Sequence, residues 1–508
     1  MEERVIKSLK ITSIAFGLIL AILSIFLVLN ESFALFTSKT EKITYSLKTY
    51  KIPMLAVQDV IYNRPYRYSH KGLVFETNKD LTAIKADVGP YDVSEKQDRS
   101  ILAYYAKQEE SDNNYVFYIA TESDKIYANP DSSNLFSGES EIINIEVLDT
   151  SKVTNMANMF SSCKSLKKLD LSSFDTSKVV DMSRMFALCN SLEQINLTSF
   201  DTSSVTDMNN MFIGCWVLED LDLSSFNTAK VIDMQKMFSN CDVLKNLNIS
   251  SFDTSKVTNM QNMFSSCKAL PELDLTNFNT INVTDMSGMF GGCKGLTNLL
   301  VSSFITHNVT NMSGMFSGCS NITSLNLSSF NTSSVENMKN MFYSCTGLTS
   351  LDLSNFDTAN VTDMSQMFYS CTGLTNINID DFNTAKVKNM NSMFSTCSKL
   401  TSIDVSSFDT SNVTDMKNMF RQCSALTSLD LSSFRTSNVT DMTTMFRQCS
   451  KLVSIDISGF VINDGVGLAN TFYLCSALQT LYVGDETYEA KLKDNAALPA
   501  RVNVIVNV

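Results

Sequence analysis

Residues 348–372 read LTSLDLSNFDTANVTDMSQMFYSCT, and stretches of this kind follow one another along most of the chain. Cys371 marks the repeat, because all 13 cysteines occupy this one position. Successive cysteines lie 26 residues apart, without an insertion or deletion. A fixed period of this length is typical of a solenoid, in which each repeat forms one coil stacked on the next. The repeated cysteines are Cys163, Cys189, Cys215, Cys241, Cys267, Cys293, Cys319, Cys345, Cys371, Cys397, Cys423, Cys449 and Cys475.

Two periodicities lie within each coil. The LDL run at 351–353 alternates apolar and polar residues, which is the spacing of a strand. Met and Phe side chains at 364, 367 and 368 and the cysteine at 371 fall on one face of a helix, with Thr362 placed as an N-cap. The sequence therefore predicts an α/β repeat, a leucine-rich-repeat-like solenoid whose coils consist of strand, turn and short helix.

The methionines and phenylalanines support a repeated core. Every methionine except Met1 and Met54 occupies one of the two helix-face positions of a coil. Most phenylalanines fall at the position before the FDT-type turn or three residues before a cysteine, as Phe356 and Phe368 do. Methionine is an adaptable apolar filler, so these positions are expected to line the interior of a solenoid over residues 140–483.

The combined pattern LxxLDLSSFDTSxVTDMxxMFxxC resembles the repeat of BspA-like leucine-rich-repeat surface proteins of bacteria and some parasitic protists. The segment from Asp92 to Phe136 is similar to the module that often precedes these repeats. The resemblance implies a cell-surface leucine-rich-repeat protein, and some members of that family are linked to adhesion to host matrix or cells. It does not identify a ligand.

The amino terminus predicts export. Arg4, Lys7 and Lys10 precede an apolar run from Ile11 to Leu29, which as a helix reaches about 28 Å and matches a bilayer core. We expect a cytoplasmic tail at 1–10 and an uncleaved transmembrane anchor at 11–30, with the repeats outside the cell. The alternative is a cleaved signal peptide and a secreted protein.

Three further segments complete the predicted organisation. Residues 31–84 are expected to form a stalk or a small module. Residues 85–139 predict a β-rich cap, with paired strands at 100–107 and 114–121. Leu468 and Thr471 replace the usual methionine pair near the end, which suits a terminal coil followed by a last strand at 481–483 and a cap or tail at 484–508.

Composition argues against several classes of function. The net charge of −13, from 40 basic and 53 acidic residues, does not suit nucleic-acid binding. Only 2 histidines are present, which removes the commonest routes of acid–base catalysis. No nucleophile–base signature or metal-ligand spacing occurs, so we expect no enzyme, no cofactor and no metal.

Candidate sites lie on repeated positions. An Asp or Asn recurs between the two apolar strand residues and is expected to face outward. This stripe is either a cation- or ligand-binding row or a solvated strand face in which Asn dilutes like-charge repulsion. The cysteine ladder is best interpreted as buried free thiols, because an odd number of cysteines cannot pair fully and no CxxC motif occurs. The candidate stripe is Asp352, Asn378, Asp404, Asp430 and Asp456.

Two other repeated positions carry polar or aromatic residues. A threonine ladder runs from Thr176 to Thr436, and it suits either an exposed binding array or turn chemistry. Neighbouring coils also carry two pairs of residues that commonly anchor interfaces. These pairs are Tyr343 with Tyr369 and Arg421 with Arg447.

The leading functional hypothesis is a membrane-anchored surface protein that binds a macromolecule, either a protein or a glycan, through the inner, strand-lined arc of the solenoid, in adhesion to host or matrix components. A structural surface spacer without a specific ligand is the alternative. An exported enzyme is a third and weaker possibility, given the scarcity of catalytic residue types.

Overall fold

The computed structural model describes residue 55 and residues 70–107 and 115–507. These fall into two compact units, which divide between Lys230 and Val231. The predicted tail at 1–10, the predicted anchor at 11–30 and most of the predicted stalk lie outside the described residues. Within the described residues, no helix is long and apolar enough to cross a membrane.

The first unit begins with a five-stranded sheet in the order β2-β3-β4-β1-β6. The predicted strand pair is confirmed, because β3 and β4 pair antiparallel along their length. The sheet also takes β1 from before residue 85 and β6 from after residue 139, so it extends past both predicted limits of the cap. Its elements are β1 (His70–Glu76), the 3-10 turn η2 (Leu81–Ala83), β2 (Val88–Asp92), β3 (Ile101–Lys107), β4 (Tyr115–Thr121) and β6 (Ile142–Ile143).

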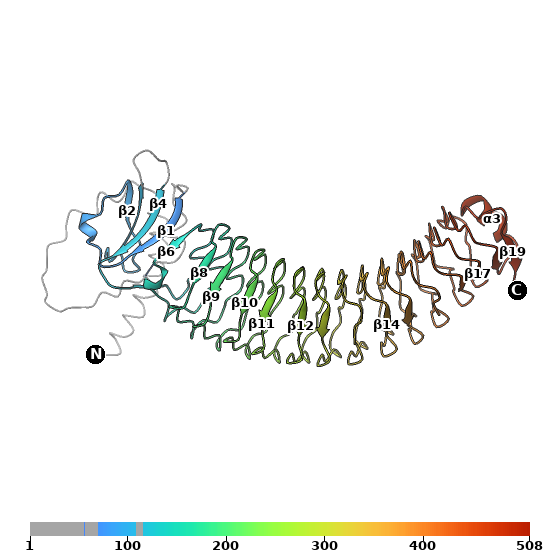
Figure 1. Ribbon diagram of the computed structural model, residues 1–508, viewed down its shortest axis with the longest axis horizontal. Coiled ribbons are helices and arrows are strands. Elements are labelled where there is room, and N and C mark those ends of the chain that lie inside the picture. Colours follow the sequence, from blue (N-terminus) through green and yellow to red (C-terminus); the bar gives the residue numbers. More distant parts are fainter. Residues whose placement is uncertain (1–54, 56–69, 108–114, 508) are drawn as a thin grey trace, which may run out of the picture. The chain divides into compact units, whose positions relative to one another are not determined.

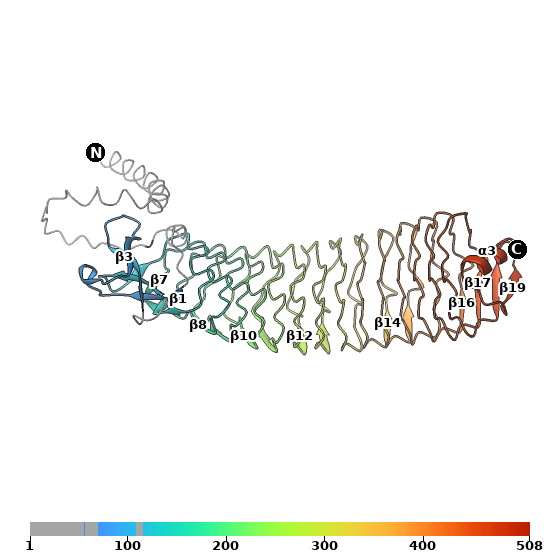
Figure 2. The same cartoon turned by 90° about the horizontal axis from the view of Figure 1, so that it is seen from above.

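Coils follow this sheet and also form most of the second unit, where they lie side by side with their strands aligned (Figure 1, Figure 2). Equivalent strands pair in parallel, as in Leu351 opposite Ile377. The predicted solenoid of 26-residue coils is thus confirmed. The coil strands are β5 (Ile126–Tyr127), β7 (Leu148–Asp149), β8 (Lys168–Asp170), β9 (Gln194–Asn196), β10 (Asp220–Asp222), β11 (Asn246–Asn248), β12 (Glu272–Asp274), β13 (Asn298–Leu300), β14 (Ser350–Asp352), β15 (Asn376–Asn378), β16 (Ser428–Asp430), β17 (Ser454–Ile457) and β18 (Thr480–Val483), with the 3-10 turn η3 at Ile145–Val147.

The predicted short helix of each coil is wrong. Residues 363–371 form consecutive turns, because Gln366 and Ser370 adopt left-handed backbone conformations with φ of 57° and 61°. A right-handed helix cannot continue through such residues. Equivalent positions in most other coils also have positive φ. We call this stretch of each coil the turn segment.

The backbone N–H groups of the turn segment alternate between two partners. Those of Gln366, Phe368 and Ser370 donate to carbonyl oxygens of the next coil, at 2.8, 2.9 and 2.8 Å. Those between them donate three residues back, as Tyr369 does to Gln366 at 3.1 Å. Half of the donors therefore close the local turns, while the other half join one coil to the next.

The interior is filled by side chains that stack on their own copies. The rings of Phe342 and Phe368 lie 5.6 Å apart and almost parallel, at 2°. A second phenylalanine ladder includes Phe330 and Phe356, whose ring centroids lie 6.5 Å apart. The methionines of the turn segments, such as Met364 and Met367, are fully buried. Apolar burial of this kind is the main favourable contribution to folding.

The carboxyl-terminal end differs from the prediction. The strand at 481–483 is β18 (Thr480–Val483), but it is followed by helix α3 (Tyr488–Asn495) and by β19 (Asn503–Val506). Strand β19 pairs in parallel with β18 and so extends the sheet beyond the predicted last strand. The N–H of Phe472 donates to the carbonyl of Ala496 at 2.8 Å, where another coil would otherwise bind. This segment caps the coils of the second unit.

The threonine ladder links neighbouring coils through both functions of its hydroxyl group. Thr306 Oγ1 donates to the carbonyl of Asn331 and accepts the N–H of the same residue, both at 2.8 Å. Thr306 is fully buried. Substitution of Thr306 by valine should leave the N–H and the carbonyl of Asn331 without this partner. The free energy of unfolding should fall by about 1–3 kcal/mol, measured as a lower unfolding midpoint in urea. The exposed Thr310→Val is the matched control, and an equal shift in both variants would contradict this role.

Candidate functional site

The cysteine ladder belongs to the interior. All 13 cysteines are buried free thiols. Cys371 Sγ donates to the carbonyl of Phe342 in the preceding coil at 3.0 Å, and Cys345 bonds to Phe316 in the same way. Burial raises the pKa of Cys371 to about 12, so its thiol stays protonated near neutral pH. A protonated, enclosed thiol is neither a nucleophile nor a metal ligand.

Thiol chemistry can test this placement. The native full chain, treated with iodoacetamide at mildly alkaline pH, should show no labelled cysteine by mass spectrometry, because neither thiolate nor access is available. Denaturation in guanidinium chloride should expose all 13. A Ser450→Cys variant, whose new thiol lies at an exposed position beside Cys449, serves as the reactive control. Fast labelling of several native cysteines would show that the ladder is accessible.

The threonine ladder is also used internally. Its members from Thr176 to Thr436 are buried, and hydroxyls such as those of Thr176, Thr358 and Thr436 donate to carbonyl oxygens of the next coil. An exposed threonine array is therefore absent at these positions. The turn-chemistry interpretation misses these bonds, because they join two coils and do not lie within one turn.

The Asp and Asn stripe lies on the exposed strand face, as expected. Its side chains accept hydrogen bonds from the residue two positions later, as Asp404 does from the N–H of Ser406 at 2.9 Å. Asn378 Nδ2 also donates to Asp352 Oδ1 at 3.2 Å, so Asn joins two coils where an Asp would repel. The carboxylates of the stripe thus act as turn acceptors. Asp430 and Asp456 make the equivalent bonds to Ser432 and Ser458 at 2.9 and 2.8 Å.

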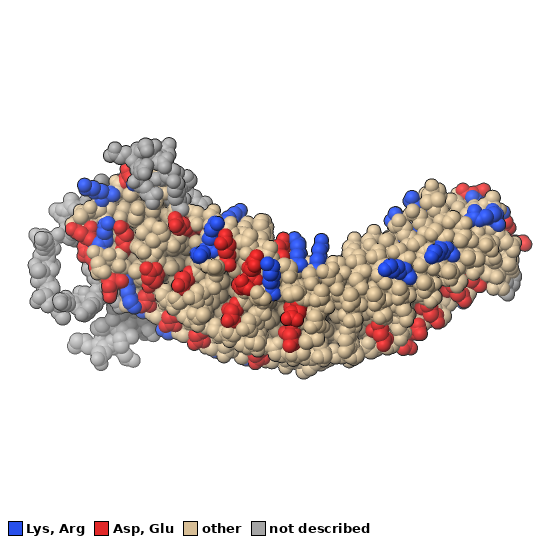
Figure 3. Space-filling model, viewed as in Figure 1, with Lys and Arg blue, Asp and Glu red and all other residues tan. Residues whose placement is uncertain are grey.

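These bonds also explain the electrostatics of the stripe. Hydrogen bonds from the side chain and N–H of Ser406 lower the pKa of Asp404, and the Ser354 bonds lower that of Asp352. Among the described residues, no group of three or more His, Cys, Asp or Glu side chains is arranged to hold a metal ion. Carboxylates nevertheless recur along the lower edge of the second unit in the space-filling view (Figure 3).

Substitution can separate the turn role from cation binding. Asp404→Asn should keep the turn, because Asn326 and Asn378 accept the same type of bond. Asp404→Ala should lower stability by about 1 kcal/mol or less, since one exposed hydrogen bond is lost. Thermal unfolding of the wild-type chain should be unchanged by millimolar Ca²⁺. A calcium-dependent rise in the melting temperature that Asp404→Asn abolishes would instead establish a cation site.

The tyrosine and arginine pairs lie on the outward side of the turn segments. The rings of Tyr343 and Tyr369 stack 4.9 Å apart at an angle of 7°. The guanidinium of Arg447 lies over the ring of Tyr473, with its central carbon 5.3 Å from the centroid. Arg421 occupies the equivalent position one coil earlier than Arg447, and both arginines are partly exposed. The pairing expected from the sequence is thus present, and Tyr473 joins it.

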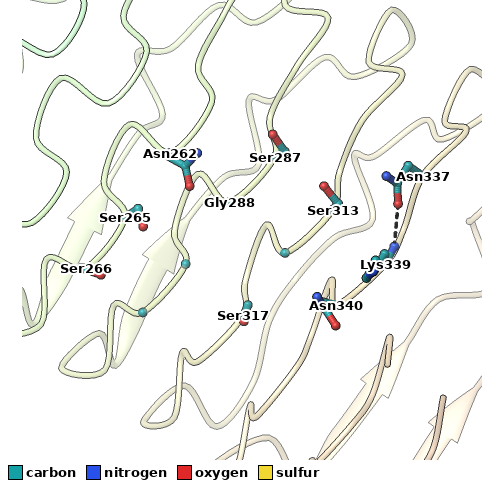
Figure 4. A pocket seen from close by; sticks show the side chains of 13 residues that line it. Asn262, Ser265, Ser266, Ser287, Gly288, Ser313, Ser317, Asn337, Lys339 and Asn340 are labelled. Carbon is teal, nitrogen blue, oxygen red and sulfur yellow. Dashed lines mark hydrogen bonds between the residues drawn. The ribbon is translucent and has the colours of Figure 1, made fainter. Parts of the chain in front are cut away.

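A cavity that sequence reasoning missed lies on the same side of the second unit. It has a volume of about 470 Å³ and is open to solvent. Serine, asparagine and glycine residues of four consecutive coils line it, among them Asn262, Gly288 and Ser313 (Figure 4). The available signal was the cluster of Gly288, Gly291, Gly292 and Gly314, at positions that carry larger side chains in other coils.

Comparison with known proteins places these features in a family. The family described as Mycoplasma protein of unknown function, DUF285, matches residues 130–241, 214–321, 293–402 and 373–483. No curated protein matches the chain.

Several similar solved structures are of bacterial proteins. A leucine-rich repeat protein from Bacteroides ovatus is 17% identical over 70% of this chain and 88% of that one, with a TM-score of 0.39. A leucine-rich repeat protein from Eubacterium ventriosum is 15% identical over 56% and 79%, with a TM-score of 0.22. The pneumococcal vaccine antigen PcpA is 13% identical over 87% and 91%, with a TM-score of 0.21.

Proposed function

This chain belongs to the DUF285 family, and we propose that it is an exported surface protein, anchored by residues 11–30, that binds a macromolecule through the outward side chains of its coils. Adhesion to a host or matrix component is the specific role we propose. The apolar run from Ile11 to Leu29, which predicts export, and the BspA-like repeat pattern support this proposal.

The observation that carries it is the contrast between inward and outward positions. The inward residues of the turn segment are the same in nearly every coil, with Met, Met, Phe and Cys repeated throughout. The outward position held by Tyr369 is instead Gly291, Ser317 and Arg421 in other coils. A spacer needs only the repeated interior. Tyrosine and arginine on a solvent-facing position are typical of residues that anchor interfaces.

The repeated polar groups support binding more than catalysis. The cysteines are buried, the threonines bond between coils, and the strand carboxylates accept hydrogen bonds within turns. These three repeated groups are therefore already used within the solenoid. An extended rigid surface, by contrast, is how solenoids commonly bind other molecules.

A direct binding measurement tests the proposal. The full chain in lipid nanodiscs, titrated over immobilised matrix proteins and over intact host cells, should bind at least one surface saturably at micromolar concentration or below. The heat-unfolded chain is the control for non-specific contact. Absence of saturable binding to every surface would contradict adhesion and favour the structural spacer.

A further inference from the structure

Basic and acidic residues are distributed unequally over the turn segments of the second unit. We define the turn face as the positions equivalent to Ser365, Gln366, Tyr369 and Ser370 in the coils of the second unit. None of these positions holds an Asp or Glu, although the chain has a net charge of −13. The charged residues of the turn face are all basic, namely Lys236, Lys339, Lys417, Arg421 and Arg447. A row of carboxylates borders the turn face two residues earlier in the coils, at Asp363, Asp415 and Asp441 among others, and Asp441 pairs with Lys417. The turn-face cations that are not paired with this row favour an anionic partner.

Two of these cations are available to a ligand. Lys417 forms an ion pair with Asp441, at 3.8 Å between Nζ and Oδ2. In the described part of the chain, neither Arg421 nor Arg447 pairs with a carboxylate. Arg421 and Arg447 are partly exposed, although Arg447 Nε is enclosed by the protein. A guanidinium presents fixed donors that match carboxylate or sulfate oxygens, so an anion can bind these arginines without displacing a carboxylate of the protein.

The stacked tyrosines add an aromatic platform. Tyr343 and Tyr369 cover each other on one face, while the equivalent residues of the flanking coils are Ser317 and Ser395. Ser317 is partly exposed and too small to cover a phenol ring, so the outer face of Tyr343 is bounded by a small side chain. Ser395, beside Tyr369, is fully buried. Ring faces bind flat apolar surfaces, such as the C–H face of a sugar ring.

The cavity is lined by three coils that precede Tyr343 and by Asn337, Lys339 and Asn340 of the coil that carries Tyr343 (Figure 4). Its lining offers hydroxyl and amide groups, from Ser313 and Asn262 among others. The backbone conformation of the coils does not by itself require glycine at the positions that line the cavity. Gly314 has φ of 62°, but Asn340 adopts φ of 58° at the equivalent position, and Gly291 is not left-handed. The missing side chains therefore open a polar trough beside an aromatic stack.

We propose that the turn face of the second unit binds a linear anionic glycan. Sugar rings of the glycan lie in the trough and against the ring of Tyr343, and acidic groups further along the glycan bind Arg421 and Arg447. Hydroxyl and amide donors, an aromatic platform and unpaired guanidinium groups suit this chemistry together. An acidic peptide would use the cations but would leave the hydroxyl and amide groups of the trough and the face of Tyr343 without the sugar hydroxyl and C–H partners that suit them. The inference rests on the proposed function and names its ligand class and its surface.

Binding of defined oligosaccharides tests the inference. The full chain, titrated calorimetrically, should bind heparin and hyaluronan oligosaccharides, and it should bind an uncharged maltooligosaccharide of similar length more weakly. The heparin and hyaluronan arms distinguish sulfate from carboxylate as the preferred anion. The double variant Arg421→Ser and Arg447→Ser should lose about tenfold or more in affinity, because two anchoring contacts are removed. Serine occupies this position in other coils, so folding should be retained.

A second variant tests the trough without removing charge. Gly314→Asn should weaken binding by filling the cavity, and it should leave thermal unfolding unchanged. The nearest atom to an added Cβ is Ser317 Cβ at 3.8 Å, and Asn340 already adopts the required backbone conformation. The charge-matched control is the double variant Lys256→Asn and Lys386→Asn, which removes two cations at a position where other coils carry Asn. The affinity of this control should change by less than about twofold.

Three outcomes would overturn the inference. They are absence of glycan binding at physiological salt, an equal loss of affinity in the Lys and Arg double variants, and equally tight binding of a polyglutamate peptide. If any of these occurs while the chain still binds matrix or host cells saturably, the glycan inference fails and the proposed function stands.

Discussion

The structure depends on one constraint: the backbone donors of each turn segment are divided between their own coil and the next. Gln366, Phe368 and Ser370 donate to the following coil, and the residues between them close local turns. A buried N–H without a partner is costly, so the alternation leaves a coil incomplete until a neighbour supplies carbonyl oxygens. The cap formed by α3 and β19 follows from the same requirement, because Phe472 uses the carbonyl of Ala496 in place of another coil.

Stacking also determines which side chains remain for function. Cysteine thiols, threonine hydroxyls and strand carboxylates are reactive or ligand-binding groups in many proteins, but here each has a partner that holds the coils together. What varies from coil to coil is the outward side of the turn segment, which carries the polar trough, Tyr343 and Tyr369 and, some coils further on, Arg421 and Arg447. Differences between coils therefore fall on side chains that do not line the interior.

The sequence predicted the repeat, its period, its interior residues and the paired strands β3 and β4, because these follow from periodicity and apolar pattern. The helix predicted for the turn segment was wrong. The spacing of the inward residues fits both a helix and a series of four-residue turns, as it does for Met364, Met367, Phe368 and Cys371. A signal against the helix was present. Asn or Gly recurs at the positions of Gln366 and Ser370 in several coils, and these residues favour left-handed conformations.

The candidate site was predicted less completely than the fold. The tyrosine and arginine pairs were identified, because their residue types stand out at one repeated position. The trough could not be found in this way, since it arises from side chains that are missing on two neighbouring coils and is visible only once those coils are placed side by side. The threonine ladder shows the same limit, because bonds between coils depend on a register that one coil does not reveal.

Hydrogen–deuterium exchange of the native full chain is the most direct measurement of coil-to-coil bonding. Peptides covering residues 363–371 should exchange as slowly as those covering strand β14, because the amides of both segments bond to a neighbouring coil. Fast exchange of 363–371 beside a protected β14 would show that the turn segments do not hold the coils together, and it would contradict the account.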